Sequence, residues 1–283
     1  MDKMVGIGVL AVLVAVIVLA FQSLMPQTTA QVIEKSAMER ITSEGKLKIC
    51  FMPWPPVMMK DPNTGAVSGE SVDAVNIIAE EAGLKVEYIE STWGTFAAAI
   101  QAGQCDAAIG IFSTIQRATV LSFARPMFYT GNGVLVKAGE TRFNSTADFD
   151  KPDVKIAVVQ GEVGHLYVQK HLKNAQVIVL SGGDISLALA QVSAGKADAA
   201  FTDAWTIAQY AMVHNETMDF LDLHPEAAYG INPTTIAVKQ TNTDLLNFFN
   251  TAILDLEVNG QLKELSQTYN TTWLRSEMVL EKS

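Results

Sequence analysis

The stretches AGQCDAAIG, residues 102–110, and AGKADAAFTD, residues 194–203, decide how this chain folds. Both contain the pattern A-G-x-x-D-A-A, and the two copies begin 92 residues apart, at Ala102 and Ala194. In each copy a helical pattern ends at a glycine, which accepts the left-handed conformation of a helix C-terminus, and a strand pattern follows. Seven residues can repeat by chance, but each copy introduces the last strand of a similar series. The repeat therefore predicts two similar α/β lobes.

The segments around each copy alternate between strand and helix patterns. In the first series, strand patterns occupy residues 46–52, 84–90 and 105–112, and helix patterns occupy 71–83 and 94–103. In the second, strand patterns occupy 154–159, 175–180 and 197–203, and helix patterns occupy 161–172 and 185–195. This order favours mostly parallel sheets flanked by helices. Ligands of such sheets bind beyond the carboxyl ends of the strands, so two facing lobes predict a cleft.

The composition is that of a folded chain, and the sequence offers few candidate residues for catalysis, metal binding or phosphate binding. Its 283 residues are 49% hydrophobic and 18% charged, enough to bury a large core. A net charge of -10 without runs of Lys or Arg argues against a nucleic-acid partner. The sequence shows no Ser-His-Asp or Cys-His arrangement, metal-ligand cluster or phosphate loop, so we expect no metal and no cofactor. Surface positions are predicted for the four histidines, His165, His171, His214 and His224.

The first thirty residues differ from the rest. Residues 4–21 are apolar without interruption, at the lower edge of a membrane span and long for the apolar part of a signal peptide. The small residues ending at Ala30 resemble a cleavage site, so residues 1–30 form either a removed signal peptide or a retained anchor. Both alternatives place the remainder outside the cytoplasm, in the periplasm or its equivalent. Export permits a disulfide between Cys50 and Cys105, although two small apolar residues in neighbouring strands explain the pair equally well.

Several motifs together resemble one family, the exported solute-binding proteins that deliver amino acids to ABC importers and have the type II periplasmic binding fold. Thr114 and Arg117 are followed by SFARPMFY at 122–129, and FMPWPPVM at 51–58 matches the end of the first strand. Further matches are VVQG at 158–161, YGINPTTIAVKQ at 229–240 and the helical pattern of residues 245–269. The resemblance extends from about residue 46 to residue 269.

The resemblance implies a lobe plan and partners. Lobe 1 would comprise residues 46–133 and 229–272, lobe 2 residues 134–228, and residues 273–283 a C-terminal tail. Hinge strands are expected near residues 131–136 and 228–235. The implied protein is a monomer that closes on a small solute, an amino acid or a related amine-bearing compound, and presents it to the membrane permease of an ABC importer.

The resemblance also implies roles for individual residues. Arg117 would hold a ligand carboxylate in a bidentate fork, and Asp203 would accept a hydrogen bond from an ammonium group, although Asp203 also suits a helix N-cap. Trp54 and Trp93, on loops at the cleft edge, would contact the ligand side chain. Gly110 and Thr114 would add backbone or hydroxyl contacts. The repeat acids, Asp106 and Asp198, are expected to orient their junctions rather than touch ligand.

Four positions depart from the family pattern, and the first is Phe51, which stands where many relatives carry an acid in the first strand. Phe112 stands where a hydroxyl side chain is usual, and Glu162 and Val163 replace a pair of small hydroxyl residues. An acid near a bound carboxylate opposes it by Coulomb repulsion. Glu162 with Asp203 therefore suits a cationic group, facing a wall of Trp54, Trp93, Phe51 and Phe112. Two alternatives remain for Glu162, which are a solvent-facing position and a cap on the helix that follows.

Two further classes of function stay open. Dehydratases that act on cyclic amino-acid precursors share this fold, and Glu162 would be the acid-base group of such an enzyme. Turnover of a ligand, rather than its stoichiometric retention, separates that class from a binding protein. The third class is a sensor component that presents its ligand-bound form to a membrane receptor. Copurification with a permease or with a receptor separates transport from sensing.

Overall fold

The computed structural model describes residues 35–220 and 229–271. The predicted signal peptide or anchor, the C-terminal tail from residue 273 and the first residue of the second hinge segment lie outside the described residues. No helix within the described part of the chain has the length and apolar character needed to cross a membrane.

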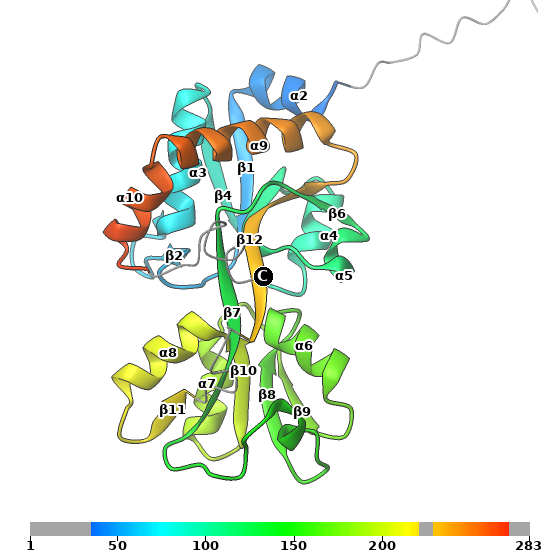
Figure 1. Ribbon diagram of the computed structural model, residues 1–283. Helices are drawn as coiled ribbons and strands as arrows, with labels where there is room; N and C mark the ends of the chain where they lie inside the picture. The colour runs from blue at the N-terminus through cyan, green and yellow to red at the C-terminus, as the bar shows by residue number, and fades with distance from the viewer. Residues whose placement is uncertain (1–34, 221–228, 272–283) are drawn as a thin grey trace, which may run out of the picture. The chain divides into compact units, whose positions relative to one another are not determined.

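Helices and strands follow the predicted alternation and form one large mixed sheet with helices against it, while β2 and β3 form a separate two-stranded sheet (Figure 1). The strand order is β4-β1-β5-β12-β7-β10-β8-β9, with β6 on β12 and β11 on β7. We call the half built on β1, β4 and β5 lobe 1, and the half built on β8, β9 and β10 lobe 2. Both halves contain parallel pairs, β1 with β4 and β5, and β8 with β9 and β10.

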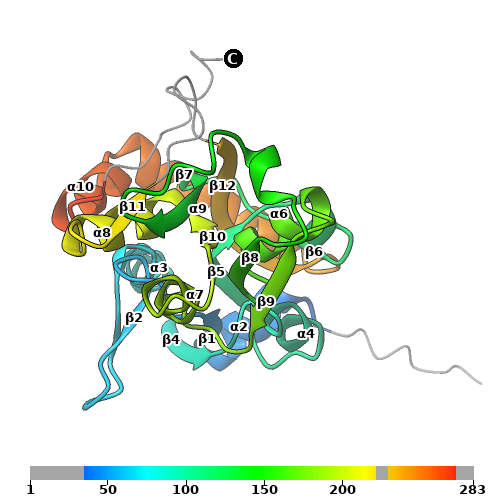
Figure 2. The same ribbon diagram turned by 90° about the horizontal axis from the view of Figure 1, so that it is seen from below.

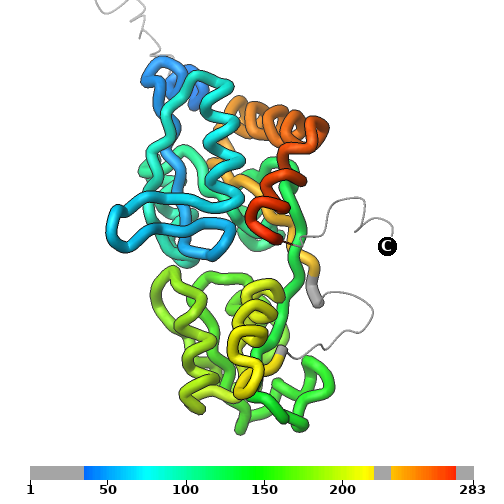
Figure 3. The backbone as a smooth tube through the Cα atoms, turned by 90° about the vertical axis from the view of Figure 1, so that its left-hand side faces the viewer, coloured from blue at the N-terminus to red at the C-terminus, as the bar shows by residue number. Residues whose placement is uncertain are grey.

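Lobe 1 contains the N-terminal elements and both C-terminal helices. Its elements are α2 (Ala37–Glu44), β1 (Lys46–Phe51), β2 (Met59–Lys60), β3 (Val67–Ser68), α3 (Glu70–Glu81), β4 (Lys85–Glu90), α4 (Phe96–Gln101), β5 (Ala107–Phe112), α5 (Ile115–Ala118), β6 (Leu121–Phe123), α9 (Thr243–Val258) and α10 (Gln261–Thr268). The last two, orange and red in Figure 3, lie against the blue and cyan N-terminal segments, with α9 contacting α2 and α10 contacting α3.

Lobe 2 repeats the strand and helix order on its own core. Its elements are η1 (Thr146–Phe149), β8 (Lys155–Val159), α6 (Val163–His171), β9 (Gln176–Leu180), α7 (Ser186–Ser193), β10 (Ala199–Asp203), α8 (Ala204–Val213) and β11 (Met218–Phe220). Figure 2 shows β8 beside β9, with α6 next to them. A cluster around Phe149, Val158 and Phe201 fills one side of this half.

Two long strands join the lobes. β7 (Phe128–Lys137) and β12 (Tyr229–Lys239) pair antiparallel between residues 128–132 and 229–234. The rest of β12 continues onto β5 and β6, whereas the rest of β7 continues onto β10 and β11. Each strand therefore belongs to both halves, as expected for the hinge strands of a type II fold.

The repeated sequence forms the same junction in both lobes. Gly103 and Gly195 have left-handed φ angles of 72° and 68° after α4 and α7. Asp106 Oδ2 accepts a hydrogen bond of 2.8 Å from Lys48 N, and Asp198 Oδ2 accepts one of 2.8 Å from Lys155 N. Each acid thus ties its last strand to the first strand of its own lobe, so the predicted orienting role of both acids is confirmed.

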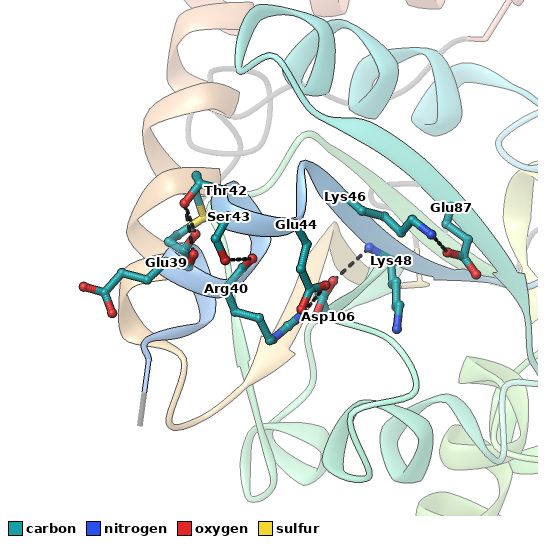
Figure 4. A network of polar contacts seen from close by, with 10 residues as sticks. Glu39, Arg40, Thr42, Ser43, Glu44, Lys46, Lys48, Glu87 and Asp106 are labelled. Atoms are coloured by element: carbon teal, nitrogen blue, oxygen red, sulfur yellow. Dashed lines mark hydrogen bonds and ion pairs between the residues drawn. The ribbon is translucent and has the colours of Figure 1, made fainter. Parts of the chain in front are cut away.

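An arginine from outside the repeat also contacts each of these acids. Arg40 of α2 pairs with Asp106, which is almost fully buried, and Glu44 approaches the same guanidinium (Figure 4). Arg142 Nη2 lies 2.8 Å from Asp198 Oδ1 in lobe 2. Because a buried carboxylate without partners is costly, the pair with Arg40 allows Asp106 to stay at the strand junction, whereas Asp198 is only partly buried.

A disulfide joins Cys50 to Cys105, so the pairing that the sequence left open is present. Cys50 lies in β1, Cys105 lies two residues before the start of β5, and the two Cα atoms are 5.6 Å apart. Both residues are buried in the core of lobe 1. The bond closes a loop across a sequence separation of 55 residues.

Replacing both cysteines by alanine should lower the free energy of unfolding by about 4 kcal/mol, because the unfolded chain regains the entropy of that loop. Urea unfolding followed by circular dichroism measures the change. As a control, a reducing agent should destabilise the wild type and leave the double variant unaffected. Equal stability of the two oxidised proteins would contradict the prediction.

Candidate functional site

The predicted site residues come together at the carboxyl ends of strands from both lobes. Trp54, Trp93 and Thr114 follow β1, β4 and β5, respectively, and Glu162 follows β8. Asp203 is the last residue of β10. In parallel sheets these strand ends share one edge, which explains how residues far apart in sequence meet.

Aromatic rings fill the lobe 1 side of the site. The centroid of Trp54 lies 6.2 Å from that of Trp93, 5.3 Å from that of Phe112 and 6.3 Å from that of Phe128. Phe51 contacts Tyr88 edge-on at 6.2 Å. Trp54 is 1% exposed and Trp93 5% exposed, so both rings are buried. They lie on connecting segments but point into the interior, and the sequence analysis missed Phe128.

Both tryptophans donate hydrogen bonds to lobe 2. Trp54 Nε1 donates to Thr206 Oγ1 at 3.0 Å. Trp93 Nε1 donates to the Gly183 carbonyl oxygen at 2.9 Å. Buried indole groups need such partners, and here the partners belong to the facing lobe. The two rings therefore hold the lobes together as well as lining the site.

Arg117 is buried and joins the lobes through main-chain acceptors. Its Nη1 donates to Phe112 O at 2.9 Å, and its Nη2 donates to Gly161 O at 2.8 Å. The guanidinium carbon lies 5.2 Å from the centroid of Phe96. Burial lowers the pKa of Arg117 to about 10, and the charge of Glu162 opposes that change. A guanidinium has five N–H donors, so the two bonds leave donors for a carboxylate.

Thr114 positions the segment that carries Arg117. Its hydroxyl oxygen accepts a hydrogen bond of 3.2 Å from Arg117 N and so caps α5. The predicted ligand contact of this hydroxyl therefore competes with a capping role.

Glu162 and Asp203 bring two carboxyl groups to the lobe 2 side. Glu162 is 2% exposed and caps α6, where its Oε2 accepts a hydrogen bond of 2.7 Å from Gly164 N. Of the alternatives for Glu162, the helix cap is confirmed and the solvent-facing position is wrong. Asp203 is fully buried and caps α8, where its Oδ1 accepts a hydrogen bond of 2.9 Å from Thr206 N. Its Oδ2 has no hydrogen-bond partner within the described residues.

Burial and mutual repulsion disfavour the charged forms of these acids. Burial is the main reason why the pKa of Glu162 is raised to about 8, and the charge of Asp203 is the second. Burial raises the pKa of Asp203 to about 6, and hydrogen bonding from Thr206 opposes that rise only in part. The cluster of Arg117, Glu162 and Asp203 therefore favours a proton on Glu162 at neutral pH.

The small residues of the site permit close backbone approach. Gly161 has φ 77°, and a Cβ there would lie 2.6 Å from Trp93 O and 2.7 Å from Gly94 Cα, across the lobe boundary. Gly110, inside β5, has φ 66°, and a Cβ there would lie 2.5 Å from the Met58 methyl group. Val163, the first residue of α6, is buried.

His165 differs from its predicted surface position. It is half-buried on α6, and its Nδ1 accepts a hydrogen bond of 2.9 Å from Gly161 N. His171 and His214 are exposed, and His224 lies outside the described residues. The described residues contain no group of three His, Cys, Asp or Glu side chains that could hold a metal ion.

A cavity of about 680 Å³, which the sequence analysis did not predict, lies beside the site between α5 and α6. Thr114 and Val163 link it to the predicted ligand contacts. It is lined by Thr114, Ile115, Gln116, Asn132, Val163, Leu166, Tyr167, Gln169, Lys170, His171 and Asn232. Asn132 and Asn232 come from the two hinge strands and hydrogen-bond to each other at 2.7 Å.

The sequence of residues 47–272 matches the family model of the bacterial extracellular solute-binding proteins, family 3. The chain belongs to this family. The resemblance drawn from the sequence motifs is therefore confirmed. A relative, the probable histidine-binding protein of Neisseria gonorrhoeae, is 25% identical over 206 residues, which cover 72% of this chain and 75% of that protein.

Two solved structures share the family 3 fold. An ancestral amino acid-binding protein, a precursor of cyclohexadienyl dehydratase, matches with a TM-score of 0.74 and 26% identity over 83% of this chain and 99% of that one. An ancestral arginine-binding protein bound to arginine matches with a TM-score of 0.71 and 28% identity, covering 80% of this chain and 98% of that one. The two-lobed type II fold is thus confirmed.

Replacing Gly161 by alanine should separate the lobes, because the new methyl group collides with Trp93 O and Gly94 Cα. Small-angle X-ray scattering should give a larger radius of gyration than for the wild type. Gly139→Ala is the matched control, since Gly139 has φ 79° and no atom within 4 Å of a Cβ. Equal radii for both variants would contradict the prediction.

The raised pKa values of Glu162 and Asp203 predict how stability depends on pH. Between the ordinary carboxyl range and about pH 8 the folded state binds more protons than the unfolded state, so the free energy of unfolding falls as pH rises. Glu162→Gln should remove the part of this fall between pH 6 and 8, which is at most about 1.4 kcal/mol per pH unit. Denaturant titrations at pH 5, 6, 7 and 8 measure the free energy of unfolding of the wild type and the variant. Parallel pH profiles of the two proteins would refute the prediction.

Proposed function

We propose that this protein captures a small amine-bearing solute, an amino acid with a cationic side chain, between its lobes outside the cytoplasm. One observation carries the proposal, namely that a buried arginine from lobe 1 and two buried carboxyl groups from lobe 2 meet beside an aromatic group. Arg117 would bind the ligand carboxylate, Asp203 the α-ammonium group, and Trp54 and Trp93 the side chain. Gly110, Phe112 and Val163 would provide backbone and apolar contacts.

The names of the relatives support this class of ligand. The relative from Neisseria gonorrhoeae is named a probable histidine-binding protein, and one ancestral structure holds arginine. Both ligands are amino acids whose side chains can carry positive charge. In this chain Asp203 Oδ2, which has no hydrogen-bond partner among the described residues, and the acid at position 162 would provide two acceptors for such ligands.

The proposal includes the working cycle. Lobe 1, residues 46–133 and 229–272, and lobe 2, residues 134–228, would separate and close about β7 and β12. The closed monomer would then deliver the solute to the permease of an ABC importer. Ligand contacts on both lobes make closure favourable, since a ligand that touches both stabilises the closed form.

An enzymatic alternative has one observation in its favour. Glu162 is a buried, predominantly protonated acid beside aromatic rings, as suits a general acid, and one ancestral relative is a precursor of cyclohexadienyl dehydratase. Incubation with cyclic amino-acid precursors tests it, because an enzyme releases product in excess of its own concentration. We favour binding without turnover.

Arg117→Ala should lower the affinity for L-arginine or L-lysine more than tenfold, because the ligand carboxylate loses its charged, bidentate partner. Isothermal titration calorimetry measures the change, with agmatine and cadaverine as matched ligands that lack the carboxylate. Wild type should bind these two amines more weakly than the amino acids, and Arg117→Ala should affect them little.

Arg125→Ala is the control variant, since Arg125 forms an exposed ion pair with Glu257 at 2.9 Å. It should leave every affinity unchanged. Wild type that binds cadaverine as tightly as L-lysine would refute the carboxylate role of Arg117. Wild type that binds none of these compounds would refute the ligand class.

A further inference from the structure

Glu162 is the feature that separates this site from an ordinary amino-acid pocket. Its carboxyl group is fixed at the start of α6 because Oε2 accepts from Gly164 N, and 2% of the residue is exposed. Helix capping alone does not require an acid here, since a serine or threonine hydroxyl satisfies the same amide group. The acid therefore brings a buried ionisable group that the cap does not need.

The charges of the cluster do not balance when every group is ionised. Arg117 contributes one positive charge, whereas Glu162 and Asp203 contribute two negative charges, and all three residues are almost fully buried. A net buried charge is unfavourable, so one carboxyl group keeps its proton. Glu162 is the more strongly affected acid, with a pKa of about 8 against about 6 for Asp203.

Among the described residues, the other groups around Glu162 do not supply the missing positive charge. His165, on the same helix, accepts a hydrogen bond at Nδ1 from Gly161 N, so Nδ1 carries no proton. Burial also lowers the pKa of His165. Asp203, from β10, adds negative charge. From lobe 1, Arg117 provides the cation, and Trp54 provides an uncharged indole whose N–H is bound to Thr206.

We propose that Glu162 makes this site selective for ligands with a net charge of +1, and that capture of such a ligand releases one proton from Glu162. The inference rests on the proposed function. The Glu162 carboxylic acid loses its proton to solvent, and the resulting carboxylate pairs with the ligand cation, so the buried charges sum to zero. A neutral zwitterion leaves Glu162 protonated and releases no proton.

Calorimetric titrations in buffers of different ionisation enthalpy count the protons directly. At pH 7, in phosphate and in Tris, L-arginine and L-lysine should each release about one proton, and L-glutamine about none. The affinity for L-arginine should rise between pH 6 and 8 by up to about tenfold per pH unit, because deprotonation and binding are linked. The affinity for L-glutamine should stay constant over the same range.

Glu162→Gln retains an acceptor for Gly164 N and the side-chain volume, so it should fold. It should abolish proton release, flatten the pH profile and weaken L-arginine binding at pH 8 at least tenfold, with L-glutamine binding unchanged. His165→Gln and the exposed Glu216→Gln are controls and should release protons like the wild type.

The outcomes separate this inference from the proposed function. Three outcomes overturn the inference and leave the proposed function standing. They are tight binding of L-arginine without proton release, proton release that persists in Glu162→Gln, and proton release that disappears in His165→Gln. If the wild type binds none of the three amino acids, the proposed function fails and the inference fails with it.

Discussion

Burial of Arg117, Glu162 and Asp203 in one cluster is the constraint on which the rest of the site depends. Each group is held by main-chain partners: Arg117 donates to two carbonyl oxygens, and each acid accepts from the first turn of a helix. These bonds place the side chains accurately but leave the charges of the cluster unequal. Hydrogen bonds to the backbone therefore set the positions of the three side chains. Low solvent access sets the protonation of the acids.

Contact between the lobes depends on small residues as much as on charged ones. Gly161 allows the Trp93 carbonyl to approach, and the same glycine provides the carbonyl that Arg117 binds. Trp54 and Trp93 add their own hydrogen bonds across the boundary. The residues that line the candidate site are thus also the residues that join the lobes, which connects ligand recognition to closure.

The local sequence pattern was enough to predict the α/β order, the repeated junction and the orienting roles of Asp106 and Asp198. These features follow from the period of the apolar residues, from the glycine that ends each helix and from the strand that comes after it. The family motif placed Arg117 after a strand of lobe 1 and Asp203 at the end of a strand of lobe 2. Sequence could not show that Trp54 and Trp93 turn inward or that His165 accepts from Gly161 N, since both depend on packing between segments far apart in the chain. A helix cap was one of the predicted alternatives for Glu162. The burial of Glu162 could not be predicted, because it depends on the facing lobe.

The path of the chain has a consequence for how such a site changes. Both α9 and α10 return to lobe 1, and the chain passes between the lobes along β7 and β12. Lobe 2 is therefore an insertion within lobe 1, and the acids of the cluster lie in the insertion while the arginine lies in the host. Recombination within these two strands would exchange Glu162 and Asp203 as one cassette and leave Arg117 in place.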